Sequence, residues 1–562
     1  MSSLSRIVGA TAIAFFGCAT TSQAQNAGTN PPPLAATVLQ QLKSYPREWQ
    51  KFLAEQRNRQ SVASHEFVGV AAGWKVLRHW LPGGASGSNP ILLTNGTVLL
   101  HQSCTSKWFS LKPDIFGNYD TGIWTAIASM PSTYTPRFFA SAVLPDGRLI
   151  VEGGEYLGVG FNSNGRPICK ATSSDDGAIY DPVANRWRSV GTPPEWTSIG
   201  DASSTLLNDG TYLLSNALTK DVATLDESTM DWTTYPSSAD KFDINDEENW
   251  TLLPDGDVIT VDAFVHQHGC APQSELYSVL GGEWFDAGST AVQLADCASK
   301  TATYEGPTQI MQPTGIVVAF GATTSTTEQN YPAHTASYSP AASQWSQGPD
   351  IPQIDSVSYT MVDAPAAILP NGSVLVAASP AAWKSSSSYP APTHFFVFDG
   401  STFTQISDIA DWKKLASYQI NLLVLPTGEI LCVETDFKRI QILPAQGVPQ
   451  AAWAPVVKTI SSKTLKAGVT YTINGTQLSG LTQGAGMGDD EQAYTNFPLV
   501  RVVNSSTRHV FYARTTFTSN SVQPNNPSKA TFVLPGNVEA GASKLYVVAN
   551  GIPSQPVSVT IQ

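Results

Sequence analysis

The chain has 562 residues, which is enough for a large core and for more than one domain. Charged residues make up 14% of it, well below the roughly 25% of an average domain, while Gly (43) and Pro (38) suit many short strands joined by turns. The formal net charge is −13. Nucleic acid is therefore not an expected partner, because proteins that bind nucleic acid neutralise its phosphates with basic patches.

The first 24 residues have the pattern of an export signal. Arg6 supplies the positive start, residues 7–16 the apolar core, and Ser22-Gln-Ala24 a small-residue cleavage site. We therefore expect a secreted or periplasmic protein, with lipoprotein processing at Cys18 as an alternative. No later apolar run is long enough to span a membrane. Residues 25–65 are expected to form a Pro-rich linker and a short helical segment.

Export implies an oxidising compartment, where disulfides can form. Cys270 and Cys297 fall in one repeat of the chain and are paired as a guess, and Cys104 and Cys169 follow second strands of neighbouring repeats and form the other guess. Cys432 lies in an apolar strand, and we expect it to be a buried free thiol.

One hairpin unit recurs along most of the chain. In residues 144–154 an apolar run meets Asp146-Gly147 and a second apolar run follows, which predicts a tight β-hairpin with a type I′ turn. Similar units recur 46 to 63 residues apart, with their glycines at Gly96, Gly147, Gly210, Gly256, Gly315, Gly372 and Gly428. A period near 50 with one hairpin per repeat is typical of propeller blades.

Each repeat is expected to supply four strands. The fourth strand usually carries an aromatic side chain that wedges between blades: Trp124, Trp187, Trp232, Trp284, Trp345 and Phe403. The last repeat needs an outer strand from elsewhere, because closure of the ring removes open sheet edges. The stretch around Trp74 is favoured for this role over Ala452-Trp453.

The repeat pattern ends near residue 455. Strands are expected within 466–473, 498–503, 530–535 and 545–548, which predicts a separate β-sandwich over 456–562. The acidic stretch Gly486–Glu491 is expected to be a solvated loop. The predicted fold class is all-β, with a propeller over 66–455 followed by this sandwich.

The repeats resemble the kelch type, and the whole chain resembles the galactose oxidase and glyoxal oxidase family. The likeness is most specific at Leu425–Gly428 with the upstream Tyr418, and at the strand Pro498–Val503. It implies a seven-bladed kelch propeller followed by an early-set Ig-like sandwich. In that family, copper lies on the propeller axis and is held by two Tyr and one His of the propeller and one His of the sandwich. One of the Tyr is cross-linked to a Cys.

Counting back from the turn glycines maps these family positions onto this chain. Tyr418 matches the axial Tyr and Tyr156 a stacking Trp, and His509 lies two residues from the sandwich His. At three other positions the ligand or cross-link chemistry is missing: Gln419 replaces a His, Phe138 the radical Tyr and Gly87 the cross-linking Cys. An amide is a poor copper ligand, and a phenyl ring has no oxygen. The copper-radical oxidation is therefore not expected.

Carboxylates stand at several of the equivalent positions. Nine residues before the turn glycines lie Asp201, Glu247 and Asp363, with Asp246, Glu248 and Glu305 beside such positions. If the blades are in register, these groups meet at one mouth of the axis, where repulsion should raise their pKa values. Loops after the second strands bring four further residues to the rim: Tyr156, His266, His268 and Trp383.

Several interpretations of this mouth stay open. Paired carboxylates can act as general acid and base on a glycoside or similar bond, or they can hold a hard cation such as Ca²⁺. They can equally be strand-start residues that only accept hydrogen bonds from backbone amides. His266 and His268 could bind a transition metal or belong to a plain polar loop, and Trp383 could pack internally or stack on a sugar.

The first functional hypothesis is binding of extracellular carbohydrate or a related polymer through the mouth, by Tyr156, His266, His268, Glu305, Trp383 and Gln419. The alternative is a copper-free hydrolase or lyase whose catalytic residues are Asp201, Glu247, Asp363 and Tyr418. A second alternative is a divergent copper oxidoreductase that uses Tyr418 and His509 with unexpected partners.

Overall fold

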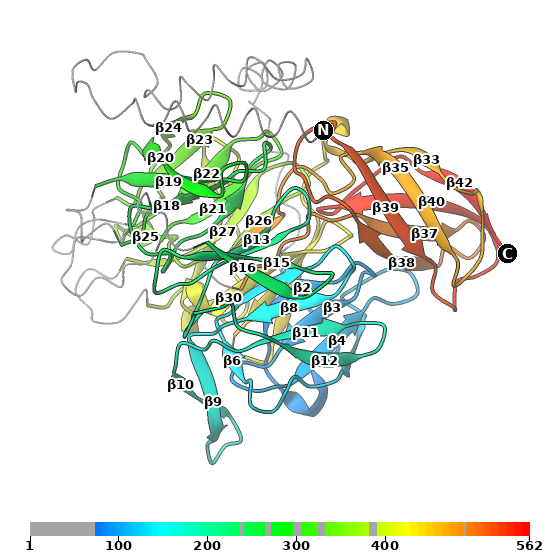
Figure 1. Ribbon diagram of the computed structural model, residues 1–562, viewed down its shortest axis with the longest axis horizontal. Coiled ribbons are helices and arrows are strands. Elements are labelled where there is room, and N and C mark those ends of the chain that lie inside the picture. Colours follow the sequence, from blue (N-terminus) through cyan, green and yellow to red (C-terminus); the bar gives the residue numbers. More distant parts are fainter. Residues whose placement is uncertain are drawn as a thin grey trace.

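The computed structural model describes residues 73–235, 241–264, 271–295, 306–322, 332–381, 390–435, 437–487 and 491–562 (Figure 1). These residues form short β-strands with a few 3₁₀ turns: η1 (Pro82–Gly84), η3 (Trp412–Lys414), η4 (Ser417–Gln419) and η5 (Ala451–Trp453). Within the described ranges, no helix is long and apolar enough to cross a bilayer. The predicted signal sequence, the linker, Cys18, Cys270 and Cys297 lie outside the described residues.

Four-stranded antiparallel sheets follow one another along the chain. The first three contain β2 (Ser88–Leu92), β3 (Val98–His101), β4 (Trp108–Lys112) and β5 (Ile123–Ala126); β7 (Ala140–Val143), β8 (Leu149–Glu152), β11 (Gly177–Asp181) and β12 (Arg186–Val190); and β13 (Ser204–Leu206), β14 (Tyr212–Ser215), β15 (Val222–Asp226) and β16 (Asp231–Tyr235). The next two contain β17 (Thr251–Leu252), β18 (Val258–Val261), β19 (Gln273–Ser278) and β20 (Glu283–Ser289); and β21 (Thr308–Met311), β22 (Val317–Phe320), β23 (Thr335–Ser339) and β24 (Gln344–Gln347).

Two further sheets complete this series in the part of the chain described. One contains β26 (Ala366–Ile368), β27 (Val374–Pro380), β28 (His394–Phe398) and β29 (Phe403–Gln405), with β25 (Tyr359–Thr360) and β36 (Ala485–Gly486) added; the other contains β30 (Ile420–Val424), β31 (Ile430–Glu434), β32 (Ile440–Leu443) and β1 (Lys75–Val76). A separate small sheet contains β6 (Pro136–Arg137), β9 (Tyr156–Phe161) and β10 (Pro167–Ala171).

Each hairpin glycine is where the sequence predicts a turn, but the turn type differs from the expectation. Gly147 has φ of +88°, whereas Pro145 and Asp146 are not among the positive-φ residues. The Gly147 N–H donates to the Leu144 carbonyl at 2.8 Å. A type I′ turn would need positive φ at both central residues, so that prediction is wrong. The hairpin instead has a longer loop that ends in a left-handed glycine.

The first strands of successive sheets surround a common centre. Hydrogen bonds join neighbouring sheets through pairs such as Ser204 Oγ to the Ser141 carbonyl (3.4 Å) and Gln309 Nε2 to the Asn249 carbonyl (2.6 Å). The Asn89 N–H donates to Asn421 Oδ1 at 3.2 Å and so joins the first sheet to the last. The ring is closed at this point.

The strand that completes the last sheet comes from the start of the described chain. β1 pairs with β32 through Lys75 opposite Ile442, as the favoured prediction had it. The outer aromatic residues also lie between sheets: Trp187 Nε1 donates to the Ala128 carbonyl of the preceding repeat at 3.0 Å, and Trp345 Nε1 to Ser274 Oγ at 2.7 Å. The wedge prediction is confirmed for these residues.

The C-terminal residues form a sheet at one side of the ring (Figure 1). Its order is β33 (Val456–Ile460), β35 (Thr470–Thr476), β39 (Pro527–Val533), β38 (Val510–Phe517), β37 (Leu499–Asn504), β40 (Gly541–Ala549), β42 (Val557–Ile561) and β34 (Thr464–Leu465), with β41 (Ile552–Pro553) on β40. This sheet and the preceding turn η5 pack on the hairpin turns: a Cβ on Gly96 would lie 2.6 Å from the Tyr512 ring of β38, and one on Gly372 2.6 Å from the Trp453 ring of η5. The mouth of the axis lies on the opposite face of the ring, where the first strands begin.

A segment of the C-terminal region enters the centre of the ring. We name residues 483–487 and 491–492 the axial segment. β36 in this segment pairs with β26, Gln492 Oε1 accepts the Ser141 N–H at 2.9 Å, and Gln483 Oε1 accepts the Leu252 N–H at 2.9 Å. Met487 and Glu491 are buried. The expectation of a solvated loop is therefore wrong at these residues, because their polar groups are bonded inside the ring.

Candidate functional site

The residues nine places before the turn glycines do gather at one face. Each precedes a first strand, and three of them, Phe138, Glu247 and Asp363, have left-handed backbone with φ of +53°, +60° and +42°. Such a conformation costs roughly 1–3 kcal/mol per non-glycine residue and is concentrated at functional sites. Oxygen atoms of Asp201, Asp246 and Glu247 lie within 4.8 Å of one another. The geometric prediction is confirmed for these side chains.

Two more carboxyls belong to this group. Glu155 and Asp363 are close enough to Asp201 for its charge to act on both of them. We name Glu155, Asp201, Asp246, Glu247 and Asp363 the mouth carboxyls. Glu155 was missed from the sequence, although it stands beside the predicted Tyr156 in the stretch Gly153-Gly-Glu-Tyr, whose two glycines signal an unusual backbone path.

Burial is the main cause of unusual titration at the mouth. It raises the pKa of Asp201 to about 6 and, together with the charge of Asp201, raises the pKa values of Glu155 and Asp363 to about 7. Burial and the charges of Asp201 and Glu155 raise the pKa of Asp246 to about 8. The mouth therefore holds carboxyl groups that exchange protons near neutral pH, as general acids and bases require.

The acids can also be neutralised by a cation. The clustered oxygens of Asp201, Asp246 and Glu247 are the donor type that Ca²⁺ prefers. Arg137 brings a positive charge to the other two mouth carboxyls, because its charge opposes the rise in the pKa values of Glu155 and Asp363. Arg137 was not predicted from the sequence. Its guanidinium lies 4.4 Å from the centre of the Phe138 ring.

The residues present do not fit the copper-radical centre of the resembling family. Phe138 packs against Tyr156, with ring centres 6.0 Å apart, and has no oxygen to offer. A Cβ on Gly87 would lie 2.2 Å from Leu100 Cδ2, so a cysteine there would have to displace the Leu100 side chain. Gln419 Oε1 accepts the Ala416 N–H at 3.1 Å and caps the turn η4.

His509 is not at the mouth, which corrects the expected match with the sandwich histidine. Its Nδ1 lies 2.6 Å from Glu539 Oε1, and its ring centre lies 5.2 Å from that of Phe116, in the turn between β4 and β5. The axial segment, which does reach the centre of the ring, contains no histidine. Its Glu491 Oε2 accepts a hydrogen bond from Asn421 Nδ2 at 2.6 Å. The proposed pairing of Tyr418 with His509 is therefore wrong.

The other predicted residues divide into two groups. Tyr418 and Gln419 lie in η4 at the start of β30, and Tyr156 begins β9 beside Glu155. Four predicted residues lie outside the described residues: His266, His268, Glu305 and Trp383. Of the predicted binding residues, Gln419 and Tyr156 are thus the two that the structure places.

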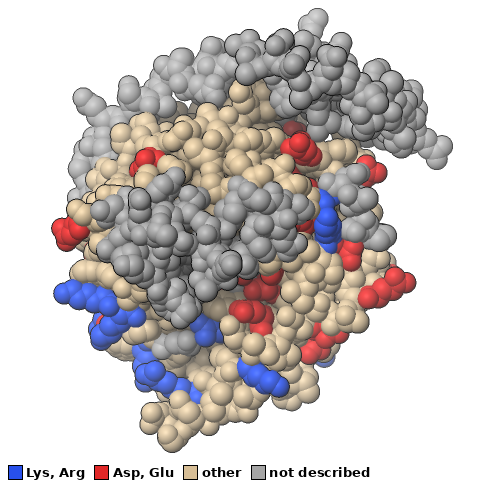
Figure 2. All heavy atoms as spheres, turned by 90° about the vertical axis from the view of Figure 1, so that its left-hand side faces the viewer, with Lys and Arg blue, Asp and Glu red and all other residues tan. Residues whose placement is uncertain are grey.

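A cleft of about 900 Å³ lies next to the mouth. Gln419 is part of its lining, and the tip of the β9–β10 hairpin forms one of its walls. Its volume is in the range of ligand pockets, which is about 300–1,000 Å³. Figure 2 looks at the side away from the C-terminal sheet and shows Lys and Arg gathered toward the lower left and most Asp and Glu toward the right. This face is thus divided in charge.

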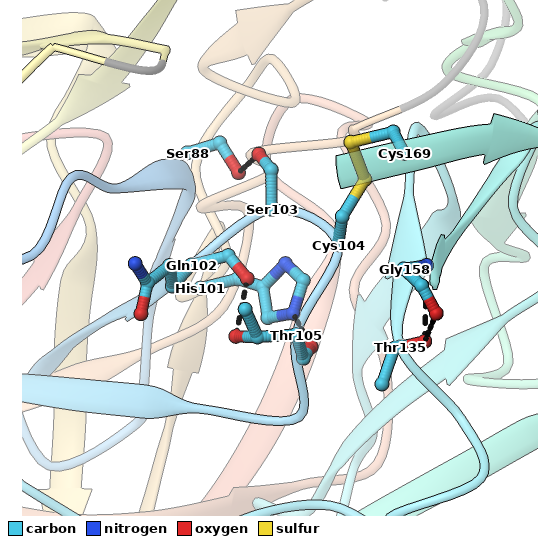
Figure 3. Close-up of a disulfide and its surroundings, with 9 residues drawn as sticks. All are labelled: Ser88, His101, Gln102, Ser103, Cys104, Thr105, Thr135, Gly158 and Cys169. Carbon is cyan, nitrogen blue, oxygen red and sulfur yellow. Dashed lines mark hydrogen bonds between the residues drawn. A yellow bond between two sulfur atoms is a disulfide. The ribbon is translucent and has the colours of Figure 1, made fainter. Parts of the chain in front are cut away.

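The disulfide guess for the described cysteines is confirmed. Cys104 is bonded to Cys169 of β10 (Figure 3). Cys432 is a buried free thiol, as expected. Behind the hairpin, the Gly158 N–H donates to the Thr135 carbonyl at 2.9 Å, and a Cβ on Gly158 would lie 1.9 Å from the Cys104 carbonyl oxygen. The base of the hairpin is thereby fixed to the loop after β3.

A second group of acids lies beside the mouth and is closed around a lysine. The Lys241 side chain is fully buried, and its Nζ lies 2.8 Å from Glu248, 2.9 Å from Glu275 and 3.8 Å from Asp243. Asp262 completes this Lys241 cluster. Burial raises the pKa values of Glu248 and Asp262 well above their usual range. Of this cluster, Glu248 alone was singled out from the sequence; Glu275 stands 34 positions away from Lys241.

Replacing Asp363 by Asn should stabilise the protein at pH 8 by about 2 kcal/mol, the upper end for single stabilising substitutions. The folded pKa of about 7 exceeds the ordinary value of 3.8, so ionising Asp363 costs stability as pH rises from 3.8 to 7. The gain should vanish near pH 3.5. Urea unfolding at both pH values measures it, with the exposed Asp175→Asn as control. A gain that is the same at both pH values would contradict the predicted burial of charge.

Comparisons with known proteins agree with the repeat pattern. No protein-family profile matches the chain. A segment of 168 residues, 30% of this chain, is 27% identical to the Kelch-like protein terF of Aspergillus terreus and spans 32% of that relative. In sequence, the chain is therefore similar to a kelch-type protein over about a third of each.

Solved structures with similar folds include a fungal alcohol oxidase of the AA5 family in complex with copper, at 14% identity and a TM-score of 0.46, covering 88% of this chain and 100% of that one. Virginiamycin B lyase from Staphylococcus aureus matches at 8% identity and a TM-score of 0.41, covering 66% and 99%. The extracellular domain of a putative one-component system from B. thetaiotaomicron matches at 12% identity and 0.43, covering 86% and 61%. The kelch-like relative and the ring of four-stranded sheets together show that the chain is similar to kelch-type β-propellers.

Proposed function

We propose that this chain is a secreted protein that binds extracellular carbohydrate or a related polymer at its axial mouth, without copper-radical chemistry. The observation that carries the proposal is the cleft of about 900 Å³ beside the mouth, which is lined largely by polar side chains and contains Gln419. Amide side chains both donate and accept hydrogen bonds, which suits the hydroxyl groups of a sugar. The Cys104–Cys169 disulfide fits an oxidising compartment.

The domain plan belongs to the same proposal. Residues 1–24 are a signal peptide, 25–65 a linker with a short helical segment, 66–455 a seven-bladed kelch propeller and 456–562 an early-set Ig-like sandwich. The sheets between Lys75 and Leu443 and the separate C-terminal sheet from Val456 support the boundary near residue 455. In this plan the sandwich covers one face of the propeller and supplies the axial segment, which leaves the other face as the binding side.

Titration calorimetry with a panel of oligosaccharides tests the binding function. Wild-type protein should bind at least one class, and Gln419→Ala should weaken that binding about fivefold to tenfold, the value of one lost hydrogen bond. Gln347→Ala, on the exposed outer strand β24, serves as the matched control and should leave the affinity unchanged. Equal affinities for wild type and Gln419→Ala, or no binding across the panel, would count against the proposal.

A copper-free hydrolase or lyase is the second candidate. The observation in its favour is that Glu155, Asp201, Asp246 and Asp363 titrate between about pH 6 and 8, so that protonated and ionised carboxyls coexist at one site. One could protonate a leaving group while another accepts a proton. Turnover of a bound polymer should then be lost in Asp201→Asn, Glu247→Gln and Asp363→Asn. Unchanged turnover in all three would remove this candidate.

A further inference from the structure

The cleft beside the mouth differs in charge from the mouth itself. Its described lining contains two cationic side chains, Arg166 and Lys438, and no carboxyl group. The remaining polar lining consists mainly of amides, and Phe437 supplies an aromatic ring: the amides are Gln102, Asn162, Asn164 and Gln419. In a chain with 45 acidic and 32 basic residues, a cleft whose described lining carries cations and no acid, beside the mouth carboxyls, is a local reversal of charge.

Both cations are held by structured parts of the chain. Arg166 lies at the tip of the β9–β10 hairpin, where the Asn162 N–H donates to the Arg166 carbonyl and Asn162 Oδ1 accepts the Arg166 N–H, at 2.9 and 3.0 Å. The Lys438 ammonium lies over the turn at Gly84, 3.2 Å from where a Cβ on that glycine would be. A side chain at position 84 would therefore displace the ammonium, so the glycine leaves room for it.

The hairpin that carries Arg166 cannot swing away freely. The Cys104–Cys169 disulfide joins β10 to the loop after β3, and Gln102 of the cleft lies in that same loop (Figure 3). Tyr156, at the other end of β9, stands beside Glu155 of the mouth carboxyls. One disulfide-linked hairpin therefore extends from the acidic mouth to the cationic cleft. A ligand chain that lies along it meets carboxyls at one end and cations at the other.

We propose that the cleft is a subsite for an anionic group carried on a polyhydroxylated chain, such as a uronate carboxylate or a sulfate ester. Arg166 and Lys438 bind the anion, the amides bind hydroxyl groups, and Phe437 packs against a sugar face. Guanidinium groups match the geometry of carboxylate and sulfate oxygens. This inference rests on the proposed carbohydrate-binding function and narrows its ligand to acidic saccharides.

Both cations are exposed at the surface, so the anion contributes modestly to affinity and its contribution depends on salt. An acidic oligosaccharide should bind about tenfold more tightly than a neutral one of equal length at low salt. The preference should shrink as the salt concentration rises through the physiological range. A preference that does not change with salt would place the selectivity in something other than these two charges.

The test is calorimetric titration of the full chain with three probes of equal length: a neutral, a uronate and a sulfated oligosaccharide. The double variant Arg166→Gln/Lys438→Gln should lose the preference for the acidic probes and keep the affinity for the neutral probe. Lys112→Gln/Lys458→Gln, which removes two exposed lysines outside the cleft and the hairpin, is the matched control and should keep the preference. The uronate and sulfate arms show which anion the subsite takes.

The outcomes separate this inference from the function on which it rests. Tighter binding of either acidic probe that the double variant abolishes supports the inference. Equal binding of neutral and acidic probes, both weakened by Gln419→Ala, would overturn the anionic subsite and leave carbohydrate binding in place. If no probe binds wild-type protein, both the subsite and the proposed function fail. A preference that survives in the double variant would also overturn the assignment of Arg166 and Lys438.

Discussion

Replacing Lys241 by Met should lower the free energy of unfolding by about 3–5 kcal/mol at pH 7, the cost of breaking a buried ion pair by removing one partner. The ammonium is fully buried and has Glu248 and Glu275 within 2.9 Å. Without it, four clustered carboxyls have no cation in the Lys241 cluster. The substituted chain must protonate them or keep unpaired charges in the core, and both cost stability.

The stability that Lys241 contributes should depend on pH. The folded pKa of Lys241 is raised above 10.5, so its stabilisation is present below that pH and is lost only at strongly alkaline pH. Burial raises the pKa values of Glu248 and Asp262, so these carboxyls take up protons at a higher pH than ordinary carboxyls do. The loss in Lys241→Met should therefore be smaller at pH 4 than at pH 7. Urea unfolding followed by tryptophan fluorescence measures both conditions.

A surface lysine provides the control for Lys241→Met. Lys458 is exposed on β33, and Lys458→Met should change the free energy of unfolding by no more than about 0.5 kcal/mol. A loss below about 1 kcal/mol in Lys241→Met at pH 7 would show that the carboxyls do not depend on the ammonium. If the free energy of unfolding falls equally at pH 4 and pH 7, the effect of Lys241→Met comes from packing and not from charge.

Removing the disulfide with Cys104→Ser/Cys169→Ser should destabilise the protein by about 4 kcal/mol at 25 °C. The two residues are 65 positions apart, and the chain-entropy model gives this value for a loop of that size. Unlike the lysine change, this one should also affect function, because β10 would lose its covalent link to the loop that carries Gln102. Affinity for the oligosaccharide that wild type binds should fall.

The wild-type protein supplies its own control for the disulfide. Treatment with a reductant should reproduce the loss of stability and affinity, while the same treatment of Cys104→Ser/Cys169→Ser should change nothing. If the double variant is as stable as oxidised wild type, the 65-residue loop is already held by its other contacts. If affinity is unchanged while stability falls, the hairpin keeps its place without the link, and the cleft does not depend on it.

Much of the ring could be predicted because its signals are local and repeated. A glycine with positive φ is needed at each hairpin, so Gly147 and its equivalents mark the first strands. Since those strands start at one face, counting nine residues back was enough to bring together Asp201, Glu247 and Asp363. The closing strand β1 followed from the need to cover an open sheet edge.

Features that depend on distant pairing could not be predicted in this way. The axial segment contains glycine and acidic residues, which are typical of solvated loops, and yet Gln483 and Gln492 are buried because backbone N–H groups of the first strands bond to them. No local sequence pattern predicts a hydrogen-bond partner in a distant strand. His509 was placed wrongly for the same reason: a small register error in the C-terminal sheet moves a side chain to another surface.

The repeat pattern predicts the regular strands and carries no signal for the Lys241 cluster or for the β9–β10 hairpin. Lys241 stands in a polar stretch where a lysine is usually exposed, and its partner Glu275 comes from β19. The hairpin is an insertion that interrupts the second repeat between β8 and β11. Its strands have exposed faces, so they lack the apolar alternation that marks a buried strand.

Hydrogen exchange of the full chain with and without a bound oligosaccharide tests the central claim most directly, because it shows where the ligand binds. The predicted result is slower exchange in peptides covering residues 154–171 and 417–424, which contain the hairpin and the start of β30. Peptides of the C-terminal sheet, such as 499–517, should be unaffected. Protection confined to the C-terminal sheet or to outer strands such as β24, with none at the hairpin or β30, would contradict a binding site at the axial mouth.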